Sequence, residues 1–232
     1  MQRVGCSLLL LFLLLSSVCG LAAGVDSDAE AIARVVERYR DKVESRLLPL
    51  FQFTGVDWPP QELQLVAIKE TRRLELWARS GERWHYIRDY RIKGMSGRLG
   101  PKLKEGDRQV PEGSYRVTRL NPNSSFHLSL KVDYPNAFDR AMAKRDGRRR
   151  LGGDIFIHGD QVSSGCLAIG DRAIEELFVL AALLGTEHIR LLVSPIDFRI
   201  YSDESLLRNR PDWIDGLYRD ISQEMRNFQR RQ

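Results

Sequence analysis

The chain has 232 residues and a formal net charge of +5 at pH 7. A charge of this size permits attraction to an anionic polymer but does not by itself define a nucleic-acid-binding protein. The basic run Arg148-Arg149-Arg150 has no interleaved aromatic residues for stacking on bases, so we expect a solvated loop there and no nucleic-acid partner.

The first residues have the pattern of a secretory signal peptide. Arg3 gives a positive start, an apolar run extends from Leu8 to Leu15, and small residues follow between Gly20 and Gly24. The apolar run is shorter than the roughly 20 residues that span a bilayer. We therefore expect residues 1–23 to be removed during export. The alternative is a lipoprotein signal with Cys19 lipidated, which the Val before that Cys disfavours.

Removal of the signal would change the cysteine content. Of Cys6, Cys19 and Cys166, only Cys166 would remain. A lone Cys in an exported protein has no partner for an intramolecular disulfide. It could be a small buried hydrophobe, but the preceding Ser163-Ser164-Gly165 is typical of a surface loop. This context favours a reactive thiol.

Residues 24–61 are predicted to form a helix and a linker. Apolar residues recur at helical spacing from Val25 to Leu50, with charged residues between them. Pro49 and the run Trp58-Pro59-Pro60 are expected to end the helix. No residue in this segment indicates chemistry.

From Glu62 onward the apolar residues form short, β-prone runs separated by turn residues. These runs are Leu63–Ile68, Leu74–Trp77, Trp84–Ile87, Ser114–Leu120 and Phe126–Val132. We therefore expect residues 62–200 to form an antiparallel β domain with few helices.

One strong helix is predicted inside this domain, from Asp171 to Gly185, with Asp171 as its cap. A closing strand is expected at Ile189–Val193. Residues 201–232 are interpreted as a charged helical tail that packs on the surface and carries no chemistry. Its anchoring side chains are expected to be Trp213, Ile214, Leu217 and Ile221.

The segment from Asp154 to Asp171 carries the candidate site. The apolar run Ile155-Phe156-Ile157 predicts a buried strand that ends at His158 and Gly159. Cys166 follows after a short polar loop, so a nucleophile and its base can come together. We expect the thiol to have a depressed pKa, because His158 can stabilise the thiolate. Gly165 gives the backbone freedom for the amides of Ser164, Gly165 and Cys166 to bind a developing oxyanion.

Several other segments accompany this site in a consistent order. They are Leu99-Gly100-Pro101-Lys102, Glu105-Gly106-Asp107, Pro111-Glu112-Gly113-Ser114-Tyr115, Asn121-Pro122, Phe126-His127-Leu128-Ser129-Leu130 and Asp133-Tyr134-Pro135-Asn136. Together they resemble the L,D-transpeptidase catalytic domain (YkuD-type), and more narrowly its YafK-like branch from the periplasm of Gram-negative bacteria. The resemblance runs from about Leu63 to Arg199. It implies a mainly β (α+β) fold, a β-sandwich with one inserted helix, flanked by N- and C-terminal helices.

The resemblance also implies a reaction. The Cys166 thiolate would attack the carbonyl between an L-centre and a D-centre of a peptidoglycan stem peptide containing meso-diaminopimelate. His158 would be the base, and no cofactor or metal would be needed. The general family implies transpeptidation between stems or onto a lipoprotein. The YafK-like branch implies hydrolytic release of an outer-membrane lipoprotein from peptidoglycan in the periplasm.

This sequence departs from the wider family near the nucleophile. Most members have a His immediately before Gly-Cys, where this chain has Ser164, and the loop from Asp160 to Ser163 is shorter than usual. Both features fit the YafK-like branch and favour water as the acyl acceptor.

Three alternatives stay open at this point. His127 matches the branch's motif and could orient His158 or bind a substrate carboxylate, or it could be a satisfied, half-buried histidine. His127, His158 and Cys166 could instead collect zinc, although their spacing is not specific for a metal site. The protein could also be a non-catalytic wall-binding module, in which Cys166 would be replaceable.

Overall fold

Eight strands form one mixed sheet in the computed structural model, which describes residues 19–201 and 211–230. The strand order is β3-β2-β1-β8-β4-β5-β6-β7. The strands are β1 (Leu63–Ile68), β2 (Arg73–Ser80), β3 (Arg83–Arg91), β4 (Gly113–Ser124), β5 (His127–Val132), β6 (Phe156–His158), β7 (Leu167–Ala168) and β8 (Ile189–Ser194). The predicted signal peptide falls largely on residues 1–18, which lie outside the described part of the chain.

The expectation of an antiparallel domain is wrong for two strand pairs. β1 is parallel to β8, and β6 is parallel to β7. β8 follows the long helix α3 (Asp171–Leu184), and such a crossover lets a strand return in the same direction as its neighbour. The short β7 brings the segment after Cys166 beside the strand that ends in His158.

Strand β4 belongs to both halves of the sheet. Its first part, Gly113 to Arg116, pairs with β8. Its later part, from Val117 to Ser124, pairs with β5 and contains two register irregularities. A strand that changes partners in this way lets a sheet turn over its own core. This mainly β, α+β arrangement agrees with the predicted fold class.

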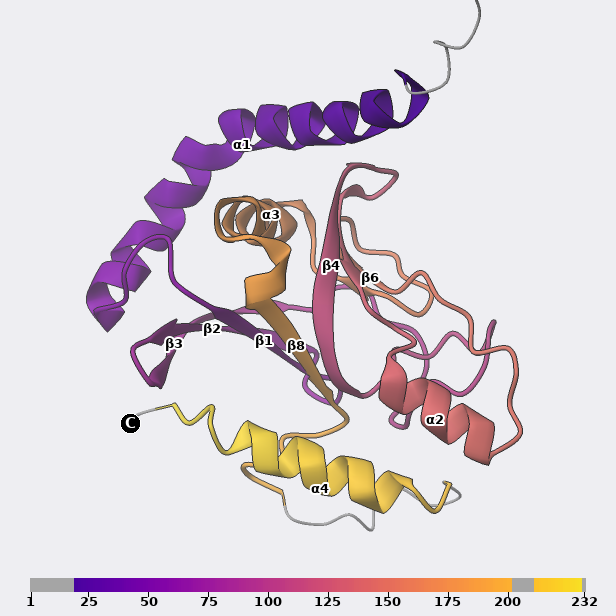
Figure 1. Cartoon of the computed structure of the whole chain (residues 1–232). Coiled ribbons are helices and arrows are strands. Elements are labelled where there is room, and N and C mark those ends of the chain that lie inside the picture. Colours follow the sequence, from indigo (N-terminus) through magenta and orange to yellow (C-terminus); the bar gives the residue numbers. More distant parts are fainter. Residues whose placement is uncertain (1–18, 202–210, 231–232) are drawn as a thin grey trace, which may run out of the picture.

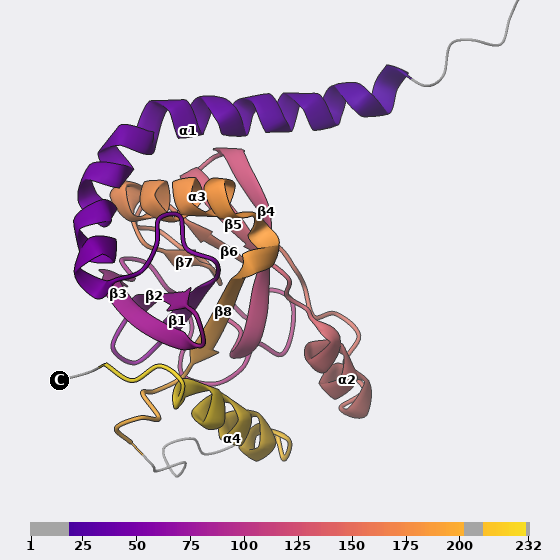
Figure 2. The same ribbon diagram turned by 60° about the vertical axis from the view of Figure 1, so that its left-hand side comes forward.

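The first core lies between the sheet and two helices, α1 (Cys19–Thr54) and α3. It contains side chains from both halves of the sheet, such as Leu65 and Leu130, and is covered by Val43 and Leu47 of α1. Figures 1 and 2 show α1 lying over α3, with its N-terminal part reaching beyond the sheet. The helix passes through Pro49 instead of ending there.

No helix in residues 19–201 and 211–230 is long and apolar enough to cross a membrane.

The second core lies on the opposite face of the sheet, under α4 (Ile214–Met225) (Figure 1). The four predicted anchors are buried there, against sheet residues that include Val66 and Trp77. The C-terminal segment therefore forms a layer of the fold, and the expectation of a surface appendix understated its role.

Helix α2 (Ala137–Arg145) has no counterpart among the predicted elements, so the domain has two inserted helices instead of one. It begins with a capping box, in which Asn136 and Asp139 each accept a hydrogen bond from the other's backbone N–H. The predicted solvated run Arg148-Arg149-Arg150 follows this helix.

Candidate active site

His158 is the last residue of β6 and lies between β5 and β7, opposite Ser129 and Ala168. Its side chain is 3% exposed. Its Nδ1 lies 2.7 Å from the carbonyl oxygen of Gly159. A carbonyl oxygen can only accept, so Nδ1 carries the proton and Nε2 carries the lone pair in the neutral ring. The backbone thereby selects the tautomer that a general base needs.

Burial lowers the pKa of His158 below its ordinary value, against smaller opposing effects of the Gly159 carbonyl and the Asp160 carboxylate. The ring of Phe126 contributes to this burial, since its centroid lies 4.7 Å from that of the imidazole. At neutral pH the ring is therefore uncharged and able to accept a proton.

Gly159 is held where no side chain fits. A Cβ at this position would lie 2.6 Å from Asp171 Oδ1 and 2.7 Å from the Phe126 carbonyl oxygen. Asp171 does not cap α3 as predicted. Its Oδ1 instead accepts a hydrogen bond from the Asp160 N–H at 2.8 Å, which fixes the loop after the histidine.

Cys166 immediately precedes β7. The register pairs Leu167 with Ile157 and Ala168 with His158. One step further back, Cys166 comes beside Phe156, whose backbone interacts with the thiol. Because side chains alternate along a strand, the register directs Cys166 and His158 toward the same face. The thiol is partly exposed, and its Sγ lies 3.5 Å from the Asp154 carbonyl oxygen.

The expected depression of the thiol pKa is wrong for this conformation. Burial raises the pKa of Cys166, and Asp154 raises it further, while the Phe156 backbone and Lys102 act in the opposite direction. In the described residues the thiol hydrogen bonds to Asp154 and not to the imidazole. The resting pair is therefore a thiol and a neutral imidazole, which requires proton transfer during attack.

The turn before the nucleophile is fixed by two serine hydroxyls. Gly165 has φ +90°, and its N–H donates to Ser96 Oγ at 2.7 Å. The Cys166 N–H donates to Ser163 Oγ at 3.0 Å, and that hydroxyl donates to the Cys166 carbonyl at 2.7 Å. Ser164 is exposed. An oxyanion that uses the Gly165 and Cys166 amides would have to displace these hydroxyls, so the oxyanion site stays a prediction.

Ser96 is a site residue that sequence reasoning missed. It lies about 70 positions before Cys166, between the predicted strand Trp84–Ile87 and the motif that begins at Leu99, in a stretch for which no element or site was predicted. Gly94 in the same segment forms an isolated bridge with Ala168 and leaves no room for a side chain, because a Cβ would lie 2.2 Å from the Gln161 carbonyl oxygen. No local pattern marks such a contact.

His127 contacts the helices α1 and α3 through its side chain. It begins β5 with a φ of +71°. Its Nε2 lies 3.2 Å from Glu175 Oε1 on α3, and its ring packs edge-on against Tyr39 of α1. This placement favours the satisfied, half-buried histidine among the roles considered. His127, His158 and Cys166 do not assemble a metal site, and no group of three or more His, Cys, Asp or Glu side chains in the described residues could hold a metal ion.

A cavity of about 210 Å³ lies beside the N-terminus of α3. Its charged lining residues are four cations and two acids: Arg88, Arg91, Lys93, Arg172, Asp89 and Glu176. Lys93 is joined to the site segment, since its N–H donates to the Ala168 carbonyl at 2.8 Å. The larger cavity, about 690 Å³, is lined mainly by residues of β4, α2 and the C-terminal segment and by none of the predicted site residues.

Comparisons with known proteins agree on one family. Residues 63–189 match YkuD, the L,D-transpeptidase catalytic domain. The L,D-transpeptidase homologue YafK of Escherichia coli (strain K12) is 35% identical over 147 residues, which cover 61% of this chain and 56% of YafK. The chain therefore matches little more than half of that relative's length.

Solved structures show more distant similarity. The helical cell shape determining protein Pgp2 of Campylobacter jejuni is 20% identical with a TM-score of 0.48, over 58% of this chain and 48% of Pgp2. Bd1075 of Bdellovibrio bacteriovorus is 22% identical with a TM-score of 0.45, over 73% of this chain and 58% of Bd1075.

Proposed function

Because the chain belongs to the L,D-transpeptidase catalytic domain family, we propose that it is a cysteine-dependent acyl-transfer enzyme acting on peptidoglycan stem peptides. The observation that carries the proposal is the pairing of β6 with β7. It brings the segment after Cys166 beside His158, whose Nε2 is left with the lone pair.

In the proposed mechanism His158 Nε2 takes the proton of the Cys166 thiol as sulfur attacks the amide carbonyl at the L,D bond. A C–S bond forms, and the carbonyl electron pair moves onto oxygen. Collapse of this intermediate breaks the C–N bond, and the leaving amine receives the proton from His158. The product is a thioester on Cys166, which a second nucleophile must release.

For that second nucleophile we favour water. The loop between base and nucleophile is short and exposed, with the side chain of Val162 70% exposed. Ser164, where a His is usual in the family, is exposed as well. Cys166 itself is partly exposed, which gives water a route to the thioester. The proposed reaction is therefore a hydrolysis. The specific substrate that we propose is a lipoprotein linked to meso-diaminopimelate, which the reaction would release.

The charge around the site supports an acidic substrate. Free carboxylates of stem peptides are attracted to a rim that contains Lys93 and Arg172. Lys93 is exposed and has no hydrogen bond or ion pair from its ammonium to any described residue.

The deciding experiment incubates the purified protein with defined muropeptides, with and without an attached lipoprotein peptide, and identifies the products by mass. Release of free peptide without new diaminopimelate cross-links supports the hydrolase. New cross-links with the lipoprotein linkage untouched indicate the alternative, a transpeptidase. Cys166→Ala is the control. Retained binding of muropeptides by both proteins, with no turnover by either, indicates a wall-binding module.

Export to the periplasm is part of the same proposal and rests on the signal-like pattern that ends near Gly24. Fractionation of cells that produce the full chain tests it. We expect the protein in the periplasmic fraction with its N-terminus shortened, and recovery of the full-length chain in the cytoplasm would contradict this.

A further inference from the structure

A buried ion pair holds the loop that supports the nucleophile. Lys69 and Glu112 have side chains that are 0% exposed, and Lys69 Nζ lies 2.8 Å from Glu112 Oε1. The same ammonium donates to the carbonyl oxygens of Gly100 and Val110 at 2.9 and 3.1 Å. Glu112 Oε1 also accepts from the Gly100 N–H at 2.7 Å. The pair therefore fixes residues 93–112, the support loop, at two points of its backbone.

The third member of this network comes from the C-terminal layer. Tyr218 of α4 is buried, and its hydroxyl donates to Glu112 Oε2 at 2.7 Å. With this bond both oxygens of Glu112 are satisfied. A buried ion pair is weak evidence for stability, because desolvation offsets the attraction. Its hydrogen bonds do, however, impose one geometry on the backbone that they hold.

The opposite side of the support loop touches the turn before Cys166. Ser96 Oγ accepts from the Gly165 N–H and donates to the Arg108 carbonyl, both at 2.7 Å. The carbonyl oxygen of Gln109 would lie 3.5 Å from a Cβ on Gly165. The turn at Gly165 thus packs against a segment whose position depends on Glu112.

We propose that Lys69, Glu112 and Tyr218 are positioning residues for the nucleophile, acting through the support loop and Ser96, so that α4 takes part in catalysis without touching the substrate. This inference rests on the proposed function for its role in turnover, but not for its effect on the Cys166 thiol. Misplacement of a reacting group by about 1 Å costs on the order of 100-fold in rate.

The experiment compares Tyr218→Phe, Ser96→Ala and the double variant in the full chain. Tyr86→Phe is the matched control, since it also removes a tyrosine hydroxyl bonded to a carboxylate, but that carboxylate, Asp89, does not belong to the support loop or to its ion pair. All assays run well below the melting temperature of each variant. The readouts are the rate of Cys166 alkylation by iodoacetamide at pH 8 and, on muropeptides, kcat and KM.

We expect each single variant to change the alkylation rate by at least about 3-fold and to lower kcat by about 10-fold with KM unchanged. The double variant should be no worse than the worse single, because both act through one path. Effects that multiply in the double variant, or an equal effect of Tyr86→Phe, would overturn the proposal. Absence of turnover by the wild-type protein would count against the proposed function alone, and the alkylation series would still decide the positioning role.

Discussion

At the scale of single residues, the position after the base tolerates no side chain. Gly159→Ala should lower kcat/KM by about 100-fold, because a Cβ there collides with Asp171 and the Phe126 carbonyl and must displace His158. Gly153→Ala is the control, since nothing lies within 4 Å of a Cβ at that glycine in the same segment. Both variants are assayed on muropeptides after their melting temperatures are compared. Equal activities of the two would contradict the model of a fixed base.

The protonation states of the resting site predict the pH dependence of the reaction. The pKa of His158 is lowered and that of Cys166 is raised, so the neutral pair persists across neutral pH. We expect kcat/KM to fall only below about pH 6.5, where the imidazole becomes charged and can no longer accept the thiol proton. A pH–rate profile of the wild-type protein measures this. An acid limb centred above 6.5 would contradict the lowered pKa of His158.

The same residues show what the sequence alone could predict. His158, Gly165 and Cys166 lie within one short segment, where an apolar strand and a glycine turn define their setting locally. Ser96 reaches the site only because the support loop folds back on it, and Glu112 holds that loop through Lys69. Both contacts span sequence separations that no local pattern encodes.

At the scale of elements, helix α2 contains an aspartate, Asp139, whose pKa is raised. Burial raises the pKa of Asp139 to about 6, although hydrogen bonds from the Asn136 N–H and the Tyr115 hydroxyl oppose the shift. The folded protein then binds this proton more tightly than the unfolded chain. The corresponding stability is present below the unfolded value near 3.8 and is lost as the pH rises through about 6.

Asp139→Asn should therefore remove this loss, because the amide carries no charge. Its oxygen can accept from the Asn136 N–H, and its nitrogen can donate to the Tyr115 hydroxyl, which also donates to the Glu112 carbonyl. At pH 7 we expect the variant to be more stable than the wild type by up to about 2 kcal/mol. Urea unfolding between pH 4 and 7 measures it, with Asp41→Asn on the exposed face of α1 as the control. If the free energy of unfolding changed equally with pH in the wild type and the variant, the raised pKa of Asp139 would be contradicted.

Two elements show why boundaries are harder to predict than their existence. Pro49 was expected to end the first helix, but burial of Leu47 and Phe51 in the first core extends α1 past it to Thr54. α2 was missed because it is short and polar, although the Asn136-x-x-Asp139 capping box that starts it is visible in the sequence. Tertiary packing extended α1 beyond Pro49, and a capping box began α2 where the sequence has no clear apolar period.

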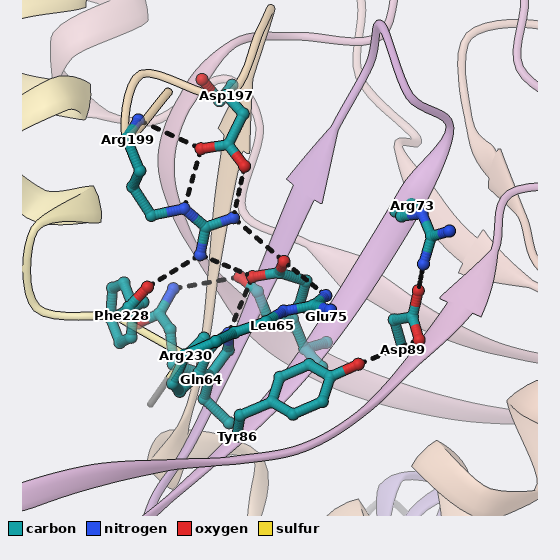
Figure 3. Close-up of polar contacts among 12 residues, drawn as sticks. Gln64, Leu65, Arg73, Glu75, Tyr86, Asp89, Asp197, Arg199, Phe228 and Arg230 are labelled. Atoms are coloured by element: carbon teal, nitrogen blue, oxygen red, sulfur yellow. Dashed lines mark hydrogen bonds and ion pairs between the residues drawn. The ribbon is translucent and has the colours of Figure 1, made fainter. Parts of the chain in front are cut away.

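At the scale of the whole molecule, one buried carboxylate joins the sheet to the chain's C-terminal segment. Glu75 of β2 is bound by Arg199 through two hydrogen bonds, of 2.9 and 3.0 Å, and by Arg230 at 2.9 Å (Figure 3). Arg199 also donates to the Phe228 carbonyl oxygen at 2.8 Å. The segment after α4 is thereby fixed to the sheet that it covers.

Arg199→Met should destabilise the protein by about 3 kcal/mol, because it leaves Glu75 and Asp197 without their main cation. Arg73→Met is the matched control, since the Arg73 side chain is 54% exposed and pairs with Asp89 in the same region (Figure 3). An exposed pair of that kind contributes less than about 1 kcal/mol. Thermal unfolding of both variants measures the difference. Equal losses of stability would refute a special role for the buried carboxylate.

The position of β8 has a consequence for the time course of folding. Among the residues that the structure describes, β8 is the last strand in sequence, yet it lies in the middle of the sheet, between β1 and β4. The second edge of β1 can therefore pair only after β8 has been synthesised, as the pairing of Leu63 with Ile189 shows. Loops of that length close slowly, and topologies dominated by such pairings fold in milliseconds to seconds. Until β8 has been synthesised and paired, the edges of β1 and β4 that it covers stay open to proteases and to other chains, so we expect the protein to be vulnerable to both during its synthesis.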